Sequence, residues 1–333
     1  MPTESRPRIA PLLVSLRQRA RASWDEPAVR TWRQGITDSL LAFGFTRLVM
    51  IAVFVSAAAI VPAKNSLQIP MTWPDFDGIL SQGDGGWYLD LAAHGYDPGS
   101  FSVDRQANWT YFPLYPLSIR LFTELGVGNG ALVGILLSNL FSLAALVVLW
   151  KLTQELAGGR AARRAVFYLC AFPTSIFLSA VSNMGLALLL LTTSMYFLLR
   201  GRWAPSSLSG AVAVLARGQA IFAVAPLAWS ALTNGGDWRG RLRRAPCLLP
   251  APFALAAFMM FMLWHTGNAL AFWEIQEAWG RELTFPGRVI GSFLLHPRLV
   301  GQGESAWDFT AMNVSVAVAA VVGLPFVFRA FGG

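Results

Sequence analysis

The chain has 333 residues, of which 55% are hydrophobic and only 13% charged, whereas soluble domains carry about 25% charged residues. This composition excludes an ordinary soluble globular enzyme. The net charge of +8 would suggest nucleic acid in a soluble protein, but here the Arg residues cluster between apolar runs, as in the cytoplasmic loops of membrane proteins. No basic stripe with interleaved aromatic residues lies outside these clusters, so we expect no nucleic-acid partner.

Apolar runs of 18 or more residues are long enough to cross a hydrocarbon core of about 30 Å. They predict an all-α polytopic membrane protein, a transmembrane helix bundle with about eight membrane segments. Residues 1–37 hold seven Arg and form a basic segment that should stay in the cytoplasm. This segment lacks the apolar stretch and cleavage site of a signal peptide. Residues 38–333 are then expected to form a single transmembrane domain.

The first span is expected at residues 39–62, and a long polar and aromatic segment follows at 63–125. With the N-terminal Arg cluster inside, this segment becomes the first extracytoplasmic loop. Spans at 127–150, 165–182 and 184–199 come next in the chain.

The apolar stretch at 206–232 is long enough for one span, but a single crossing would place the Arg-rich segment 239–244 outside the cytoplasm. We therefore predict two short helices that break around Arg217-Gly218-Gln219, within the membrane. Non-helical backbone within a membrane is tolerated only where it is buried in protein or lines a water-filled cavity. A span at 247–266, a second extracytoplasmic loop at 267–308 and a last span at 309–328 complete the chain.

The first extracytoplasmic loop carries FDGILSQGDGGWYLDLAAHGYDPG at residues 76–99. Asp77 and Asp84 are each followed by Gly, which favours turns. Apolar residues recur at helical spacing from Trp87 onward, which places Asp84 near the start of a helix at the membrane surface. An N-cap role would by itself explain an Asp there, and a cap and a catalytic base are not mutually exclusive.

Residues 108–122, NWTYFPLYPLSIRLF, combine aromatic residues with Pro113 and Pro116. This density is typical of a rigid interfacial segment whose rings lie at headgroup level. An aromatic belt of this kind needs no substrate.

At this point the sequence resembles a known family. GDGGWYLDLAAHGY and YFPLYPLSIRLF resemble the WDG-x-x-[FY]-L-x-[IL]-A-x-x-GY and FFPL-x-P signatures of PIG-V-type mannosyltransferases, which belong to the GT-C class of membrane glycosyltransferases. Residues 172–203 are similar to the family's P-x-S-x-F-x-S-x-x-YSE region. GAVAVLARGQAIFAVAPLA at 210–228 resembles its G-x-x-x-x-x-x-R-x-x-G segment, and FWEIQEAWGR at 272–281 resembles the Q-x-x-W-x-R pattern of bacterial relatives.

The chain departs from the family's pattern at three places. Gly83 stands where the family has Trp, and Arg217-Gly218 stands where it has an Arg-Pro turn. Ser182-Asn183-Met184 replaces Tyr-Ser-Glu, so the acidic substrate contact of that segment is missing.

The resemblance implies an inverting transfer of mannose from a polyprenyl-phosphate-mannose donor to a lipid-linked acceptor on the extracytoplasmic face. Such a displacement needs one carboxylate to take the acceptor's proton and positive charge near the leaving phosphate. By its position in the motif the base is Asp84, and Asp77 is the competing choice. The preference for Arg over Lys suits a bacterial plasma membrane, in which the acceptor would be a glycolipid or lipoglycan of the cell envelope.

Two arginines are the expected phosphate contacts. An Arg within an apolar stretch is costly in lipid, so Arg217 should face a cavity or a partner, and a structural ion pair would explain it equally well. Arg281 follows Trp279, and its guanidinium could bind a phosphate bidentately, although an ordinary interfacial Arg would look the same.

Four further residues are expected to contact the substrate: His94, Tyr111, Gln276 and Trp279. His94 could assist acid-base chemistry, but a His beside a Gly in a surface helix is also typical of packing or capping. Asp90 is expected on another face of the helix that begins at Asp84, where solvent would surround it.

No cofactor is expected. The sequence has no His pair or Cys cluster at ligand spacing, and lone carboxylates do not specify a divalent cation. Cys170 and Cys247 fall in or beside apolar spans, so they predict no disulfide.

Two other classes of function stay open. A lipid or sugar transporter would explain a broken helix with an Arg in the membrane. A non-catalytic subunit of a glycosyltransferase assembly would explain the missing acid near Asn183. Asp84 discriminates between an enzyme and these two classes, because catalysis requires the carboxylate of Asp84 whereas a helix cap tolerates Asn.

Overall fold

The computed structural model describes residues 27–60, 80–81, 83–233 and 238–281, together with isolated positions between 285 and 323. Every regular element within these residues is helical, which confirms the all-α prediction. Three helical stretches are long and apolar enough to cross a membrane, namely Thr31–Val53, Gly130–Ala157 and Trp238–Thr266. Asp77 and most of the span expected at 309–328 lie outside the described residues.

The chain divides into two compact units, Met1–Ile275 and Gln276–Gly333, and each is described by itself. The helices of the first unit are α2 (Pro27–Ile60), α4 (Asp84–His94), η2 (Asn108–Thr110), α5 (Leu114–Glu124), α6 (Gly130–Ala157), α7 (Gly159–Ala171), η3 (Pro173–Leu178), α8 (Met184–Leu199), α9 (Trp203–Ala216), η4 (Gly218–Ala223), α10 (Val224–Thr233), α11 (Trp238–Arg244), η5 (Ala245–Leu248), α12 (Pro250–Thr266) and α13 (Ala271–Glu274). The 3-10 helix η6 (Ile275–Trp279) leads into the second unit.

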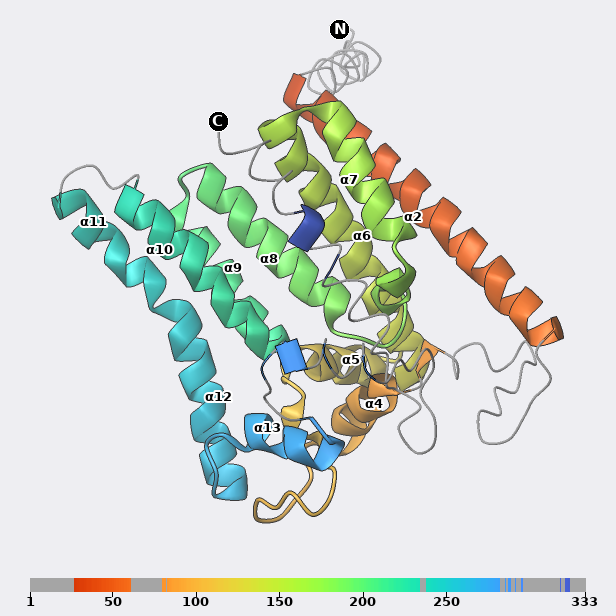
Figure 1. The fold of residues 1–333 in the computed structure, drawn as a ribbon, viewed down its shortest axis with the longest axis vertical. Coiled ribbons are helices and arrows are strands. Elements are labelled where there is room, and N and C mark those ends of the chain that lie inside the picture. The colour runs from red at the N-terminus through yellow and green to blue at the C-terminus, as the bar shows by residue number, and fades with distance from the viewer. Residues whose placement is uncertain are drawn as a thin grey trace, which may run out of the picture. The chain divides into compact units, whose positions relative to one another are not determined.

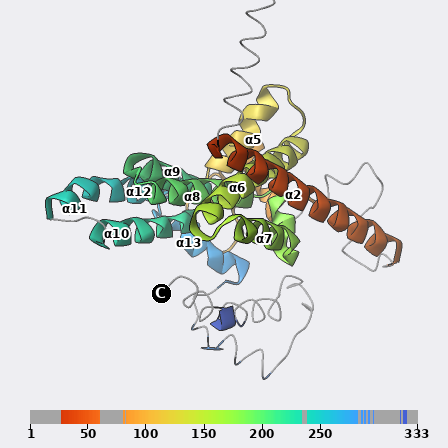
Figure 2. The same ribbon diagram turned by 90° about the horizontal axis from the view of Figure 1, so that it is seen from above.

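The long helices of the first unit pack in the order α12, α9, α8 and α6, and both α2 and α7 pack on α6. Figure 1 shows this order across the unit, and the view from above in Figure 2 agrees with it. Small residues allow the close approach of α6 and α8. A Cβ added at Gly185 of α8 would lie 2.8 Å from the carbonyl oxygen of Ser138 of α6, so only Gly fits there.

The span expected at residues 165–182 is wrong as a continuous helix. Helix α7 ends at Ala171, and the chain continues as η3 and then without helix until Met184. Pro173 lacks an N–H and disfavours helical backbone at the preceding residue, and Phe172 is indeed extended. The buried Arg47 of α2 donates to the carbonyl oxygen of Ser175 at 2.7 Å, so a side chain satisfies a backbone group near this break.

The break predicted at Arg217-Gly218-Gln219 is confirmed. Helix α9 ends at Ala216, Arg217 has extended backbone with φ −158° and ψ 119°, and η4 begins at Gly218. A Cβ at Gly218 would lie 2.5 Å from the nearest atom of the Phe112 ring. The missing side chain therefore lets the turn after Arg217 approach Phe112, in the segment between α4 and α5, closely.

Hydrogen bonds hold the segment between α4 and α5 in shape and connect it to the end of α12. The buried Asn108 donates through its backbone N–H to Asp97 and through its side chain to the carbonyl oxygen of Gly95. The carbonyl oxygen of Asp97 lies 2.9 Å from Nε2 of His265, and the backbone N–H of Phe101 donates to the carbonyl oxygen of Thr266. Helices α4 and α5 pack on each other and on α6.

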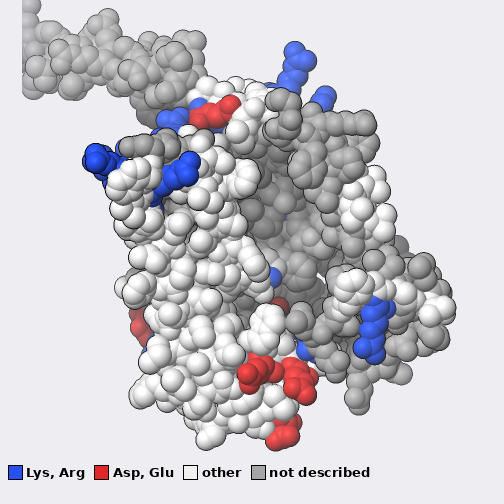
Figure 3. Space-filling view, turned by 60° about the vertical axis from the view of Figure 1, so that its left-hand side comes forward, with Lys and Arg blue, Asp and Glu red and all other residues white. Residues whose placement is uncertain are grey.

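Charge is distributed unevenly along the first unit. The α6–α7 junction, the α8–α9 junction and α11 lie at one end, whereas α4, α5 and α13 lie at the other (Figure 1). The first set carries most of the arginines of the described helices and turns, and Figure 3 shows basic side chains gathered at that end.

Candidate functional site

Asp84 is the first residue of helix α4, not its cap. The N-cap is Gly83, whose φ of 63° favours glycine, and no side chain caps the helix. The N-cap reading of Asp84 is therefore wrong. The exposed carboxylate accepts a hydrogen bond from the Tyr111 hydroxyl at Oδ1, at 3.0 Å, and the positive end of the helix dipole favours its charge.

Tyr111, which bonds to this carboxylate, belongs to a cluster of aromatic rings. The Tyr111 ring stacks on Trp87, with centroids 6.3 Å apart and planes 13° apart, and it meets Tyr88 edge-on at 4.8 Å. Tyr88 in turn meets Tyr115 edge-on at 5.2 Å. The Tyr115 hydroxyl donates to the carbonyl oxygen of Gly134 at 2.9 Å, which connects the cluster to α6.

Arg217 lies at the break between α9 and η4, and its partners are neutral. Its Nη1 donates to Oδ1 of Asn183 at 3.2 Å and lies 3.3 Å from Sδ of Met184. Asn183 is buried, and its side chain donates to the carbonyl oxygen of Ala216 at 2.7 Å. Within the described part of the chain no carboxylate pairs with Arg217, so the ion-pair explanation finds no support there.

Tyr88 connects Asp84 and Arg217 electrostatically. Burial raises the pKa of the Tyr88 hydroxyl above its usual range, the Asp84 carboxylate raises it further, and the Arg217 guanidinium acts in the opposite direction. The Tyr111 hydroxyl bonds to Asp84, and Gly218, next to Arg217, packs closely against the ring of Phe112, next to Tyr111. The chain segments that carry Asp84, Tyr111 and Arg217 therefore lie side by side.

Sequence reasoning missed Tyr88 as a member of this site. It follows Asp84 by four residues, so the two share a face of α4, and that spacing was the signal that could have identified it. Asn183 was missed for another reason: its contact with Arg217 joins residues 34 positions apart, and no spacing rule predicts such a pair.

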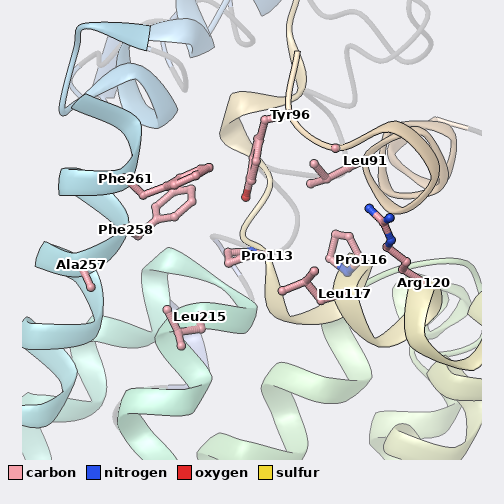
Figure 4. Close-up of a pocket in the computed structure, with 11 residues that line it drawn as sticks. Leu91, Tyr96, Pro113, Pro116, Leu117, Arg120, Leu215, Ala257, Phe258 and Phe261 are labelled. Carbon is pink, nitrogen blue, oxygen red and sulfur yellow. The ribbon is translucent and has the colours of Figure 1, made fainter. Parts of the chain in front are cut away.

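A cavity of about 400 Å³ lies beside the site. Its walls come from α4, the segment between α4 and α5, α5, α9 and α12, and are almost entirely apolar (Figure 4). The lining residues are Leu91, Gly95, Tyr96, Pro113, Pro116, Leu117, Arg120, Leu215, Ala257, Phe258 and Phe261. Asp84, Tyr111 and Arg217 do not line it, but Pro113 follows Tyr111 by two residues and Leu215 precedes Arg217 by two, so the cavity adjoins the segments that carry them. Its lining suits a hydrocarbon chain.

His94 does not join Asp84. The two residues lie at opposite ends of the 11-residue helix α4, about 15 Å apart at 1.5 Å per residue. Nδ1 of His94 is 2.9 Å from Oδ1 of Asp90, and Asn108 donates to the other oxygen of Asp90 at 3.2 Å. The expectation that Asp90 is only solvated is therefore wrong.

The remaining predicted contacts lie in the second unit and are described there alone. Nη1 of Arg281 donates to Oε1 of Gln276 at 2.9 Å, and its guanidinium lies 6.0 Å from the centroid of the Trp279 ring. These three residues form a local cluster of their own.

Comparisons of the chain with protein-family models, with curated proteins and with solved structures find no match. Among the described residues no group of three or more His, Cys, Asp or Glu side chains could hold a metal ion. Among the described residues, the features that bear on function are therefore Asp84, Tyr111, Arg217 and the cavity.

Proposed function

We propose that this chain is a membrane glycosyltransferase, a hexosyltransferase that moves mannose from a polyprenyl-phosphate-mannose donor to a lipid-linked acceptor. One observation carries the proposal. An exposed carboxylate, Asp84, has one oxygen held by Tyr111, and the ring of the next residue, Phe112, packs against Gly218. Gly218 follows Arg217, a guanidinium that no described carboxylate pairs with. A base and an uncompensated cation at one site are what transfer from a phosphate leaving group requires.

The reaction is a single displacement with inversion. The acceptor hydroxyl attacks the anomeric carbon of mannose and gives its proton to Oδ2 of Asp84. The bond between that carbon and the phosphate oxygen breaks, and the electron pair leaves with the polyprenyl phosphate. Arg217 stabilises the charge that develops on the phosphate.

The apolar cavity supports a lipid-linked donor. The cavity has a volume of about 400 Å³ and a carbon-rich lining, and it adjoins the segments that carry Tyr111 and Arg217. Removal of a hydrocarbon chain from water into such a lining is favourable, so the cavity suits the part of the lipid next to the phosphate.

The charge distribution supports an extracytoplasmic site in a bacterial plasma membrane. The basic junctions and α11 lie at the end of the first unit opposite α4 and α5 (Figure 1). Because basic segments are retained in the cytoplasm, Asp84 then faces the other side and the N-terminus lies inside.

A non-catalytic subunit of a glycosyltransferase assembly is the second candidate. Asn183 and Met184 stand where the resembling family has Ser and Glu, and both contact Arg217. A site without that acid could bind a lipid phosphate and transfer nothing.

The test is transfer of labelled mannose from polyprenyl-phosphate-mannose to membrane lipid extract by the purified protein. We expect Asp84→Asn to lower turnover by at least roughly 100-fold, as the loss of a general base does. The matched control is Asp104→Asn, an exposed acid between α4 and α5 whose carboxylate accepts a hydrogen bond from the Ser102 hydroxyl, and it should retain turnover. No transfer by the unmodified protein would favour the second candidate, and equal turnover by Asp84→Asn would move the base to Asp77.

A further inference from the structure

We propose that Tyr111 is the positioning residue of Asp84, and that its hydroxyl holds Oδ1 so that Oδ2 faces the acceptor. The inference rests on the proposed function, because it assigns Tyr111 a role in that reaction. It also replaces an expectation. The sequence suggested Tyr111 as a substrate contact, but its ring is buried and its hydroxyl donates to Asp84 at 3.0 Å.

Asp84 needs such a residue because little else holds it. Its side chain is exposed at the first position of α4, and within the described residues the Tyr111 hydroxyl is its hydrogen-bond donor. An exposed carboxylate samples several rotamers. A single hydrogen bond to a charged acceptor is strong enough to favour one of them.

Tyr111 itself is rigidly placed. Its ring lies between Trp87 and Tyr88. Its carbonyl oxygen accepts a hydrogen bond from the Tyr96 hydroxyl at 2.7 Å, and its backbone N–H donates to the carbonyl oxygen of Asn108 at 3.1 Å. The fold therefore fixes where the hydroxyl lies before any substrate arrives, which is the condition for preorganisation.

The division of labour between the two carboxylate oxygens follows from this geometry. Oδ1 accepts the hydrogen bond from the Tyr111 hydroxyl. Oδ2 accepts no hydrogen bond from the described residues and can take the proton of the acceptor hydroxyl. The tyrosine keeps its own proton throughout. The FFPL-x-P signature has Phe at the position of Tyr111, so the resemblance does not predict this hydroxyl.

Tyr111→Phe tests the inference, because it removes the hydroxyl and keeps the ring contacts. In the mannose-transfer assay we expect kcat to fall about tenfold, with the KM for donor and acceptor unchanged within about twofold. The same substitution in the Asp84→Asn background should cause no further loss of the residual turnover, because residues that act as a unit are not additive. The control is Tyr115→Phe, whose hydroxyl bonds to Gly134 instead of Asp84; it should lower the melting temperature more than Tyr111→Phe does.

Three results would overturn the inference alone: an unchanged kcat in Tyr111→Phe, a loss confined to KM, which would indicate a substrate contact, or a further tenfold loss in the Asp84→Asn background. Each presupposes that the unmodified protein transfers mannose. Failure of that transfer would overturn the proposed function, and this inference with it.

Discussion

Replacement of Arg217 by Gln tests whether an uncompensated cation serves the leaving phosphate. Only Nη1 of Arg217 is engaged by Asn183 and Met184, so Nε and Nη2 are open to a ligand as far as the described residues go. Gln keeps a donor for Asn183 but loses the charge and the paired N–H groups of the guanidinium. A hydrogen bond to a charged group contributes about 1.5 to 3 kcal/mol, which converts to a loss of roughly 10- to 150-fold in kcat/KM.

The assay is kcat/KM for polyprenyl-phosphate-mannose, measured at several salt concentrations. The matched control is Arg163→Gln, an exposed arginine that pairs with Asp38 at 3.3 Å in another part of the first unit. Because Arg163 is itself exposed and contacts none of the site residues, kcat/KM should change less than twofold in that variant. Equal kcat/KM for Arg217→Gln and the unmodified protein would refute the assignment of Arg217 to the phosphate.

Two further predictions concern the cavity and the helix packing. Ala257→Trp places a large ring in the cavity of about 400 Å³ and should raise the KM for the polyprenyl donor several-fold. Ala256→Trp, the neighbouring residue of α12 outside that lining, should leave it unchanged, and equal effects of the two would argue against the cavity as the lipid site. Gly185→Ala introduces a Cβ 2.8 Å from the Ser138 carbonyl oxygen and should destabilise the protein by about 1 to 3 kcal/mol. Gly44→Ala, whose Cβ would meet nothing within 4 Å, should be neutral or stabilising; thermal unfolding in detergent compares the two.

Local rules predicted much of the helical framework. Charge bias required a return of the chain near residue 217, and α9 ends at Ala216. Turn residues before Trp87 required a helix start near Asp84, and α4 begins there. Hydropathy failed at residues 165–182, because it counts apolar side chains and takes no account of the backbone donor that Pro173 lacks. The predicted ranges of the spans were reliable only where the apolar run contained no residue, such as Pro173, that interrupts helical backbone.

The contacts within the site could not be predicted in the same way. Tyr111 and Asp84 are 27 residues apart, and Arg217 and Asn183 are 34 apart. Whether such side chains meet depends on how α4 packs on α5, and α8 on α9, which periodicity does not encode. The residue types were informative even so, since an Arg in an apolar stretch is costly without a role.

The replacement of Tyr-Ser-Glu by Ser182-Asn183-Met184 affects the charge of the site more than its shape. A Glu at position 184 would stand where Met184 Sδ lies, 3.3 Å from Nη1 of Arg217, and would pair with that guanidinium. With Met there, Arg217 keeps its charge while Asn183 still orients it. A phosphate that leaves as an anion is stabilised by net positive charge. The departure from the signature is therefore compatible with the proposed transfer, provided that Asp84 alone supplies the base.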